Sequence, residues 1–316
     1  MRSTGPRQLP SHFFHTLLSR REGPIEIPAR RVYRLPLRGG EVRLGERTLL
    51  MGVLNVTPDS FSDGGRLAGA DAAVARGLEL FAEGADWVDV GGESTRPGAA
   101  RVPADEELRR VVPVVEGLRA RGAGPVSIDT SKSAVARAAL DAGADIVNDV
   151  SALRYDPAMT ALVAERRVPA VLMHLRGPFE AMHRSPAYHD VMGEVVRELG
   201  LALVCAERSG VARDRLLVDP GLGFSKTAEH SLEALRRLPE MASLDRPVLV
   251  GPSRKRFIGR LLDLPVERRL MGTAAAVATA VLLGAHVVRV HDVAAMAEVV
   301  KVADAVRGER APTEAA

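Results

Sequence analysis

The chain has 316 residues, of which 46% are hydrophobic and 26% charged, a globular composition with ample apolar material for a large core. A net charge of +3 with only 3% aromatic residues argues against a nucleic-acid partner. The single cysteine, Cys205, excludes a disulfide scaffold and a cysteine-rich metal site, and its apolar surroundings predict a buried helix residue. The low cysteine content fits a reducing cytoplasm, where we expect the protein. No apolar stretch predicts a membrane-spanning helix.

The chain begins with a segment, residues 1–30, whose Pro, Arg and Ser content predicts a loose extension. Residues 32–49 alternate in polarity around glycine turns, which predicts a short hairpin that closes the bottom of the main domain. We expect one domain over residues 31–307 and a tail over residues 308–316.

Eight short apolar runs recur along this domain, and nearly every one ends in a polar residue. They are residues 49–54, 87–90, 126–128, 146–147, 170–173, 216–218, 248–250 and 287–288. Helical patterns separate them at residues 71–83, 105–120, 133–141, 157–166, 189–209, 228–238, 266–283 and 293–306. This alternation predicts an α/β fold, the (β/α)8 TIM barrel, in which the carboxyl ends of the strands form the active site.

The first strand ends at Asn55, whose amide oxygen suits Mg²⁺, a cation that prefers oxygen ligands. The polar segment that follows is too long for a tight turn, which suggests a mobile lid. In that segment Phe61 suits folding over a substrate or ordinary loop packing. Asp63 suits stabilising a developing cation or simply starting the next helix.

The second strand is followed by GGESTRPGA, another glycine-rich polar loop. Thr95 and Arg96 in this loop suit an anionic substrate. A turn held by pairing of Glu93 with Arg96 is the alternative.

Three further strands end at Asp129, Asn148 and Asp219. Unpaired aspartates at the mouths of apolar strands are costly to bury, so a ligand rich in N–H donors, such as a pterin edge, would suit them. A purely structural hydrogen-bond network is the alternative.

The last two strand ends are basic. Residues 251–259, GPSRKRFIG, suit a phosphate site at a helix N-terminus, or a Schiff base on Lys255. Arg289 and His291 alternate on one strand, so they share a face and suit a diphosphate clamp. His174, after the fifth strand, is as compatible with a structural role as with a functional one.

Together these segments resemble dihydropteroate synthases, the folate-pathway family that sulfonamides target. The matching motifs are NVTPDSFSDGG, VDVGGESTRPGA, SIDTSK, VNDVSAL, LMH, DPGLGF, SRK and VRVHD, in the family's order over about residues 32–307. Members condense 6-hydroxymethyl-7,8-dihydropterin diphosphate with p-aminobenzoate. Diphosphate leaves first, and the arylamine then attacks the pterin methyl cation.

The resemblance also implies a role for each matching residue. Asp129, Asn148, Asp219 and Lys255 would hold the pterin, with Arg289 stacked on the ring and Met173 and Phe224 lining its pocket. Asn55, Arg289 and His291 would engage the diphosphate with Mg²⁺. Thr95, Arg96, Pro97, Phe61 and Ser253 would form the p-aminobenzoate site, and Asp63 would stabilise the cation. As catalytic residues the resemblance implies Asp63, Phe61, Lys255 and Arg289.

The resemblance further implies a homodimer formed through C-terminal helices. The small-residue helix predicted around residues 272–285 is too apolar to face water alone. Three alternatives remain at this point: a methyltetrahydrofolate-binding methyltransferase barrel, a pterin-binding paralogue without activity and a Schiff-base aldolase. The first of these should lack the SRK and TRPG motifs, which are present here.

Overall fold

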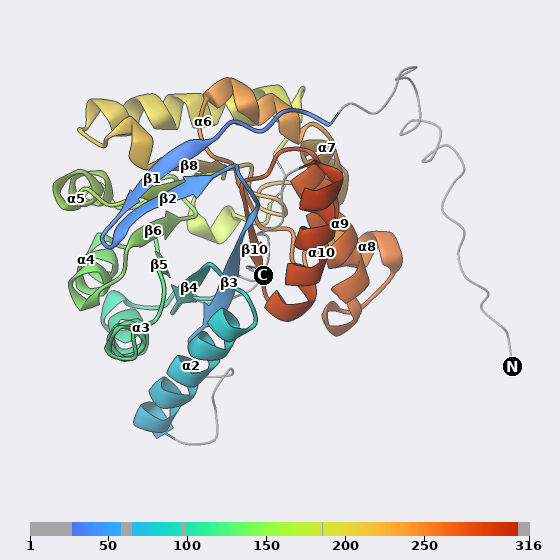
Figure 1. Ribbon diagram of the computed structural model, residues 1–316. Coiled ribbons are helices and arrows are strands. Elements are labelled where there is room, and N and C mark those ends of the chain that lie inside the picture. The colour runs from blue at the N-terminus through green and yellow to red at the C-terminus, as the bar shows by residue number, and fades with distance from the viewer. Residues whose placement is uncertain (1–26, 58–64, 96–98, 185, 309–316) are drawn as a thin grey trace, which may run out of the picture.

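The computed structural model describes residues 27–57, 65–95, 99–184 and 186–308. Its centre is a sheet of eight parallel strands in the order β8-β7-β6-β5-β4-β3-β10-β9 (Figure 1). A parallel bridge between Val218 and Val248 joins the two edge strands and so closes the predicted barrel. The strands are β3 (Leu49–Asn55), β4 (Trp87–Gly91), β5 (Val126–Asp129), β6 (Ile146–Asp149), β7 (Ala170–Met173), β8 (Leu216–Asp219), β9 (Leu249–Val250) and β10 (Val287–Val290).

Helices surround this barrel in chain order, as Figure 1 shows. They are α2 (Gly65–Ala82), α3 (Ala104–Ala120), α4 (Ser133–Ala142), α5 (Met159–Arg166), α6 (Val191–Arg208), α7 (Ala228–Arg236), α8 (Arg256–Leu262), α9 (Leu270–Leu282) and α10 (Val293–Val306). Short 3-10 turns are η2 (Phe179–Ala181), η3 (Arg213–Arg215), η4 (Leu238–Leu244) and η5 (Val266–Arg268). The eight predicted helices are present, and the short α8 is an addition to them. Helix α2 begins six residues earlier than expected.

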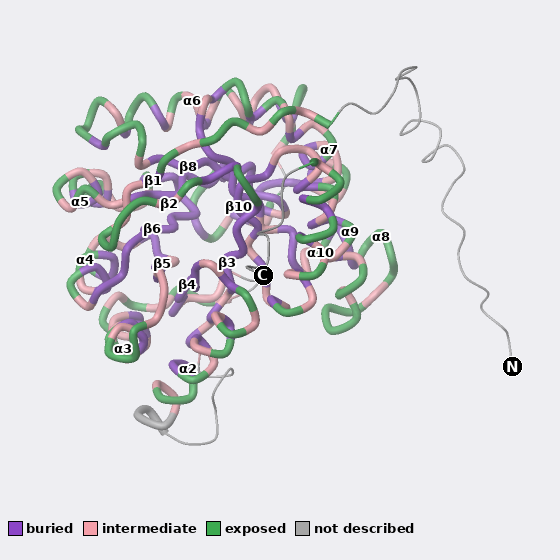
Figure 2. Tube along the Cα trace, in the orientation of Figure 1, coloured by how far each residue is buried: buried purple, intermediate pink, exposed green. Residues whose placement is uncertain are grey.

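A hairpin of β1 (Tyr33–Leu37) and β2 (Gly40–Leu44) lies across the amino-terminal end of the barrel, as predicted. Leu35 and Leu44 pack there against Trp87 and the first residues of other strands. Figure 2 shows buried residues concentrated in the strands beneath the hairpin. The hairpin therefore closes the end of the barrel opposite to the strand carboxyl ends.

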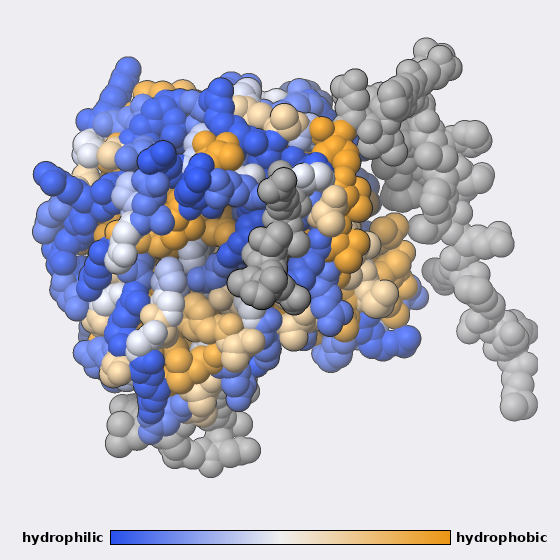
Figure 3. All heavy atoms as spheres, viewed as in Figure 1, coloured by the Kyte–Doolittle hydropathy of each residue, from blue (hydrophilic) through white to orange (hydrophobic). Residues whose placement is uncertain are grey.

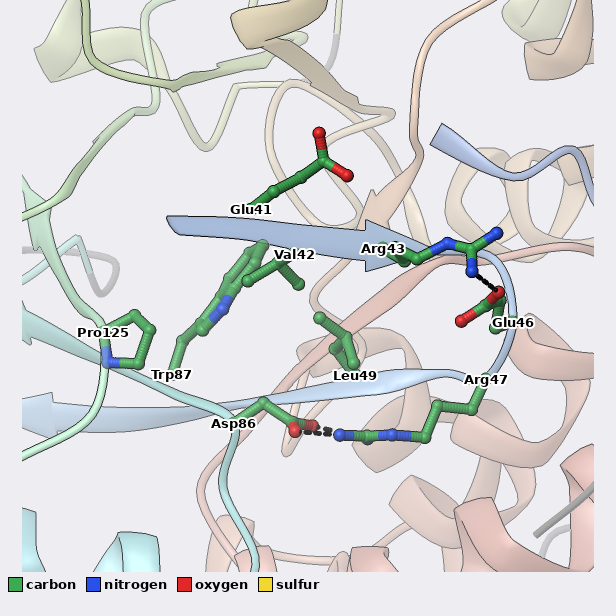
Figure 4. Close-up of a pocket in the computed structure, with 9 residues that line it drawn as sticks. All are labelled: Glu41, Val42, Arg43, Glu46, Arg47, Leu49, Asp86, Trp87 and Pro125. Atoms are coloured by element: carbon green, nitrogen blue, oxygen red, sulfur yellow. Dashed lines mark hydrogen bonds and ion pairs between the residues drawn. The ribbon is translucent and has the colours of Figure 1, made fainter. Parts of the chain in front are cut away.

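A groove of about 480 Å³ runs between this hairpin and the barrel. Figure 4 shows Trp87 and Leu49 at its floor, with an Arg47–Asp86 ion pair along one side. Because it lies at the starts of the strands, it is separate from the predicted site at their ends.

One residue lies differently from expectation, because Cys205 is exposed rather than buried. The reason is helical periodicity: α6 turns Leu199, Leu203 and Ala206 inward, which places Cys205 on the outer face.

Arg30, the last residue of the predicted N-terminal extension, makes specific contacts with the barrel. Arg30 donates to the Ala285 carbonyl oxygen and pairs with Asp304 at 3.2 Å, with its own side chain fully buried. Among the described residues, no helix is long and apolar enough to cross a membrane.

Candidate functional site

The strand registers bring the predicted site residues to one end of the barrel. Asn55 is level with Gly91 on the neighbouring strand, and Gly91 is level with Asp129. Asp129 on β5 is in turn level with Asn148 on β6. On the next pair of strands, Met173 at the end of β7 is level with Asp219 at the end of β8. Residues separated by more than 160 positions in sequence thus surround one barrel mouth.

Arg289 is the centre of the charge network in this mouth. Its Nε donates to Asp89 Oδ2 at 2.6 Å, and its Nη2 donates to Asp129 Oδ2 at 2.7 Å. Asn148 Nδ2 also donates to Asp89 Oδ2, at 2.9 Å. Burial alone would lower the pKa of Arg289, but the charges of Asp89 and Asp129 outweigh it and keep the pKa above its usual value. The arginine is therefore a fixed cation.

Asp89 was not among the predicted site residues. It is fully buried in the middle of β4, and its Oδ1 has no hydrogen-bond partner among the described residues. The signal in the sequence was a charged residue inside the apolar run WVDVG. Its contact with Asn148 has a consequence for recognition. Because the Asn148 amide nitrogen is engaged by a carboxylate, its oxygen is the atom left to accept a hydrogen bond from a ligand.

Asp219 ends β8 and starts a loop that turns sharply at Gly221. Its Oδ1 accepts from the Gly221 N–H at 2.7 Å, and its backbone oxygen accepts from the His174 N–H at 2.8 Å. Burial raises the pKa of Asp219 to about 6, although the Gly221 hydrogen bond and the charge of Lys255 oppose this shift. Its carboxylate is thus ionised at neutral pH but loses its charge in mild acid.

Met173 and Phe224, the two predicted lining residues, belong to one buried apolar cluster with Leu175, Phe179 and Met182. The Lys255 ammonium lies 4.0 Å from the centre of the Phe224 ring, a cation–π contact. Burial and the Arg289 charge lower the pKa of Lys255 to about 8. A flat apolar surface and a desolvated cation therefore meet beside Asp219, as a heteroaromatic ligand with carbonyl and N–H groups requires.

The two last strand ends are joined by Ser253 and His291. Ser253 Oγ lies 2.9 Å from His291 Nδ1 and accepts from the His291 backbone N–H at 3.2 Å. Burial, with the charges of Arg289 and Arg254, lowers the pKa of His291 to about 3. His291 is therefore neutral here, and an arriving anion would meet an imidazole held by Ser253.

His174 belongs to a buried polar chain. Its Nδ1 lies 2.8 Å from Lys226 Nζ and its Nε2 lies 3.0 Å from Glu198 Oε2, which also contacts Arg176. Burial and the Lys226 charge lower the pKa of His174 to about 4. Because a neutral imidazole then accepts from Lys226 and donates to Glu198, the chain ties the loop after β8 to helix α6. We interpret His174 as a structural residue.

The loop after β4 is held by Glu93, which pairs with Lys132 at 3.0 Å and accepts from the Val102 N–H at 2.6 Å. Lys132 also pairs with the buried Glu107. In this loop Thr95 is half-buried, and its carbonyl oxygen lies 2.7 Å from His183 Nε2. The remaining predicted residues of the first two loops lie outside the described residues: Phe61, Asp63, Arg96 and Pro97.

The described residues contain no cluster of three or more His, Cys, Asp or Glu side chains suited to hold a metal ion. Asn55, half-buried at the end of β3, offers one neutral oxygen at the barrel mouth. A single neutral ligand suits a Mg²⁺ ion that is held mainly by water and substrate phosphates.

Comparison with known proteins agrees with this geometry. Residues 51–291 match the family of pterin-binding enzymes. The dihydropteroate synthase of Mycobacterium leprae is 51% identical over 263 residues, which cover 81% of this chain and 92% of the relative. This chain belongs to the dihydropteroate synthase family.

Two solved structures of dihydropteroate synthase from Xanthomonas albilineans extend the match to three dimensions. The complex with 4-aminobenzoic acid is 48% identical with a TM-score of 0.82, covering 88% of this chain and 99% of the other. The complex with 7,8-dihydropteroate is 46% identical with a TM-score of 0.79, covering 87% and 98%. Family membership is thus supported by sequence, fold and the polar residues at the strand ends.

Proposed function

We propose that this chain condenses 6-hydroxymethyl-7,8-dihydropterin diphosphate with p-aminobenzoate, giving 7,8-dihydropteroate and diphosphate. The observation that carries the proposal is the set of acceptors and cations around Arg289. Asp219, Asn148 and Lys255 match the donors and the carbonyl of a pterin ring, and Phe224 and Met173 offer apolar surface to its faces. The name of the Mycobacterium leprae relative, dihydropteroate synthase, agrees with this activity.

The residues at the mouth suit a reaction in which the diphosphate departs before the arylamine attacks. Arg289 and His291 would stabilise the leaving diphosphate. Asn55 would hold Mg²⁺ together with the phosphate oxygens, where the ion would neutralise their charge. After the C–O bond breaks, the pterin methylene carries positive charge, and the p-aminobenzoate nitrogen attacks it and then loses a proton. The carboxylates around Arg289 favour that cation electrostatically.

Three further features are part of the proposal. Ser253, beside His291, and Thr95 would belong to the p-aminobenzoate site with Arg96, Pro97 and Phe61, while Asp63 would stabilise the cation. The protein would work in the cytoplasm. Helix α9 and its neighbours would form a homodimer interface.

The decisive experiment measures diphosphate release from the pterin diphosphate with each component left out in turn. We expect release over many turnovers only when p-aminobenzoate and Mg²⁺ are both present, because the arylamine must capture the pterin methyl cation before the site can react again. A chelator that removes the metal should abolish this release. Formation of 7,8-dihydropteroate in equal amount identifies the reaction. Release over many turnovers without p-aminobenzoate, with the pterin alcohol as product, would identify a hydrolase and contradict the proposal.

A further inference from the structure

His183 joins two loops that the proposed reaction must hold together. It follows η2 in the segment after β7, and that segment is fastened to the loop after β8. The Ser225 N–H donates to the Met182 carbonyl oxygen at 2.6 Å, and Ser225 Oγ donates to the Arg176 carbonyl oxygen at 2.7 Å. The backbone beside His183 is therefore fixed to the loop that carries Phe224.

The His183 side chain contacts both of these loops. It stacks on the Phe224 ring, with centroids 5.8 Å apart and planes at 25°. Its Nε2 lies 2.7 Å from the carbonyl oxygen of Thr95, in the loop after β4. A carbonyl oxygen can only accept, so Nε2 carries the proton and donates it. One side chain thus connects the predicted p-aminobenzoate loop to the predicted pterin pocket.

We propose that His183 is a positioning residue for p-aminobenzoate, which it serves by holding the Thr95 carbonyl at a fixed distance from Phe224. The inference rests on the function proposed above. The loop that carries Thr95 would form part of the p-aminobenzoate site, so its position relative to the pterin pocket decides how tightly p-aminobenzoate is held beside the pterin. His183 touches the loops and not the reacting atoms, so it acts through Thr95.

Two substitutions separate the contacts of His183. His183→Phe keeps a ring against Phe224 and removes the donor to Thr95. His183→Gln removes the ring and keeps an N–H donor of similar reach. Tyr155→Phe is the matched control, since it deletes another donor to a backbone carbonyl of the same segment, the 2.8 Å bond to Gly177, without touching Thr95. The readouts are KM for p-aminobenzoate, kcat, and the dissociation constant of the pterin diphosphate.

His183→Phe should raise KM for p-aminobenzoate about tenfold, as expected for one lost hydrogen bond. It should leave kcat and pterin diphosphate affinity within about threefold. His183→Gln should restore KM to within about threefold of wild type, and Tyr155→Phe should match wild type. Thermal unfolding checks that each variant is folded, and His183→Met, which also lacks a donor, replaces His183→Phe if that variant does not fold.

An unchanged KM in His183→Phe would overturn the inference. So would an equal loss of pterin affinity and kcat in both the Phe and Gln variants, because a purely structural contact would act in that way. These outcomes are distinct from failure of the proposed function, in which wild-type protein itself releases no diphosphate in response to p-aminobenzoate.

Discussion

Single carboxylates decide what this barrel mouth can recognise. Asp219 suits a ligand with two adjacent donors, because only a carboxylate accepts both. Asp219→Asn keeps the shape of the side chain but replaces one acceptor oxygen by an NH2 group, which would face an N–H donor of the ligand. Pterin diphosphate affinity should fall roughly a hundredfold or more, since a charge-assisted pair is lost and donors are left unsatisfied. Calorimetry measures the affinity, and an Asn variant that folds and binds as tightly as wild type would place the pterin elsewhere.

The same residue gives a pH dependence. Asp219 must be ionised to accept both bonds, and burial raises its pKa to about 6. Affinity for the pterin alcohol, a probe without titrating phosphates, should therefore be constant above about pH 8, where both Asp219 and Asp129 are ionised. It should fall roughly tenfold per unit once the pH drops below about 6. Burial also raises the pKa of Asp129, which would steepen the fall. In Asp219→Asn the affinity should no longer fall through the titration of residue 219. An equally large fall in that variant would show that another group causes the pH dependence.

Asp89 is the residue on which the arginine network depends. Asp89→Ala leaves the Asn148 amide nitrogen without this acceptor and removes one of the two carboxylates on Arg289. Breaking such a buried pair should lower the free energy of unfolding by about 3 kcal/mol or more. Catalytic activity should also fall, even in the fraction of protein that is folded, because Arg289 and Asn148 lose their orientation. Urea titration measures the first effect. Glu165→Gln, which disturbs an exposed pair with Arg137, is the control and should leave stability unchanged.

At the scale of an element, the loop after β8 is shaped by two glycines with positive φ. A Cβ on Gly221, at φ +67°, would lie 2.1 Å from the backbone oxygen of His174. A Cβ on Gly223, at φ +80°, would lie 3.4 Å from the flexible Lys255 side chain. Both alanine variants suffer left-handed strain of about 1 kcal/mol, but only the first must also displace backbone.

Gly221→Ala should therefore be the more destabilising variant, and it should weaken pterin binding because the loop carries both Asp219 and Phe224. Chemical denaturation and calorimetry on the two variants together provide the test. Equal effects at Gly221 and Gly223 would show that strain alone matters and that the approach to His174 does not.

At the scale of the whole molecule, large apolar side chains are exposed along one side. Leu262, Val266 and Leu270 are each about 40% exposed, and Met271 is 78% exposed. Figure 3 shows an apolar area over the side where Figure 1 draws α8 and α9. A group of exposed apolar side chains on one side of a protein is typical of an interface between protein copies.

Met271→Glu should therefore shift the proposed dimer towards monomer, because a charge would be buried on association. Light scattering at micromolar concentration measures the mass. Leu201→Glu is the control, since Leu201 is 62% exposed on α6, away from this surface. Wild-type protein that is already monomeric at that concentration would contradict the dimer.

The sequence by itself determined the barrel and most of its mouth. Eight apolar runs with helices between them fix the alternation of strand and helix, and parallel strands place their carboxyl ends together. The polar residues that end the runs, from Asn55 to His291, are therefore predicted to lie at one site. The glycine caps at Gly84, Gly143 and Gly284 have positive φ, a local property that the sequence also indicates.

Only the tertiary structure decided which polar groups contact one another. Asp89 holds Arg289 across 200 residues of chain, and His183 reaches Thr95 across 88. No local sequence pattern predicts contacts between residues so far apart in the chain, because these contacts depend on strand order and on how loops from different strands pack. Cys205 shows the same limit on a single helix. An apolar neighbourhood predicted burial, but the rotation of α6 against the barrel, set by its other side chains, turned that residue to the solvent.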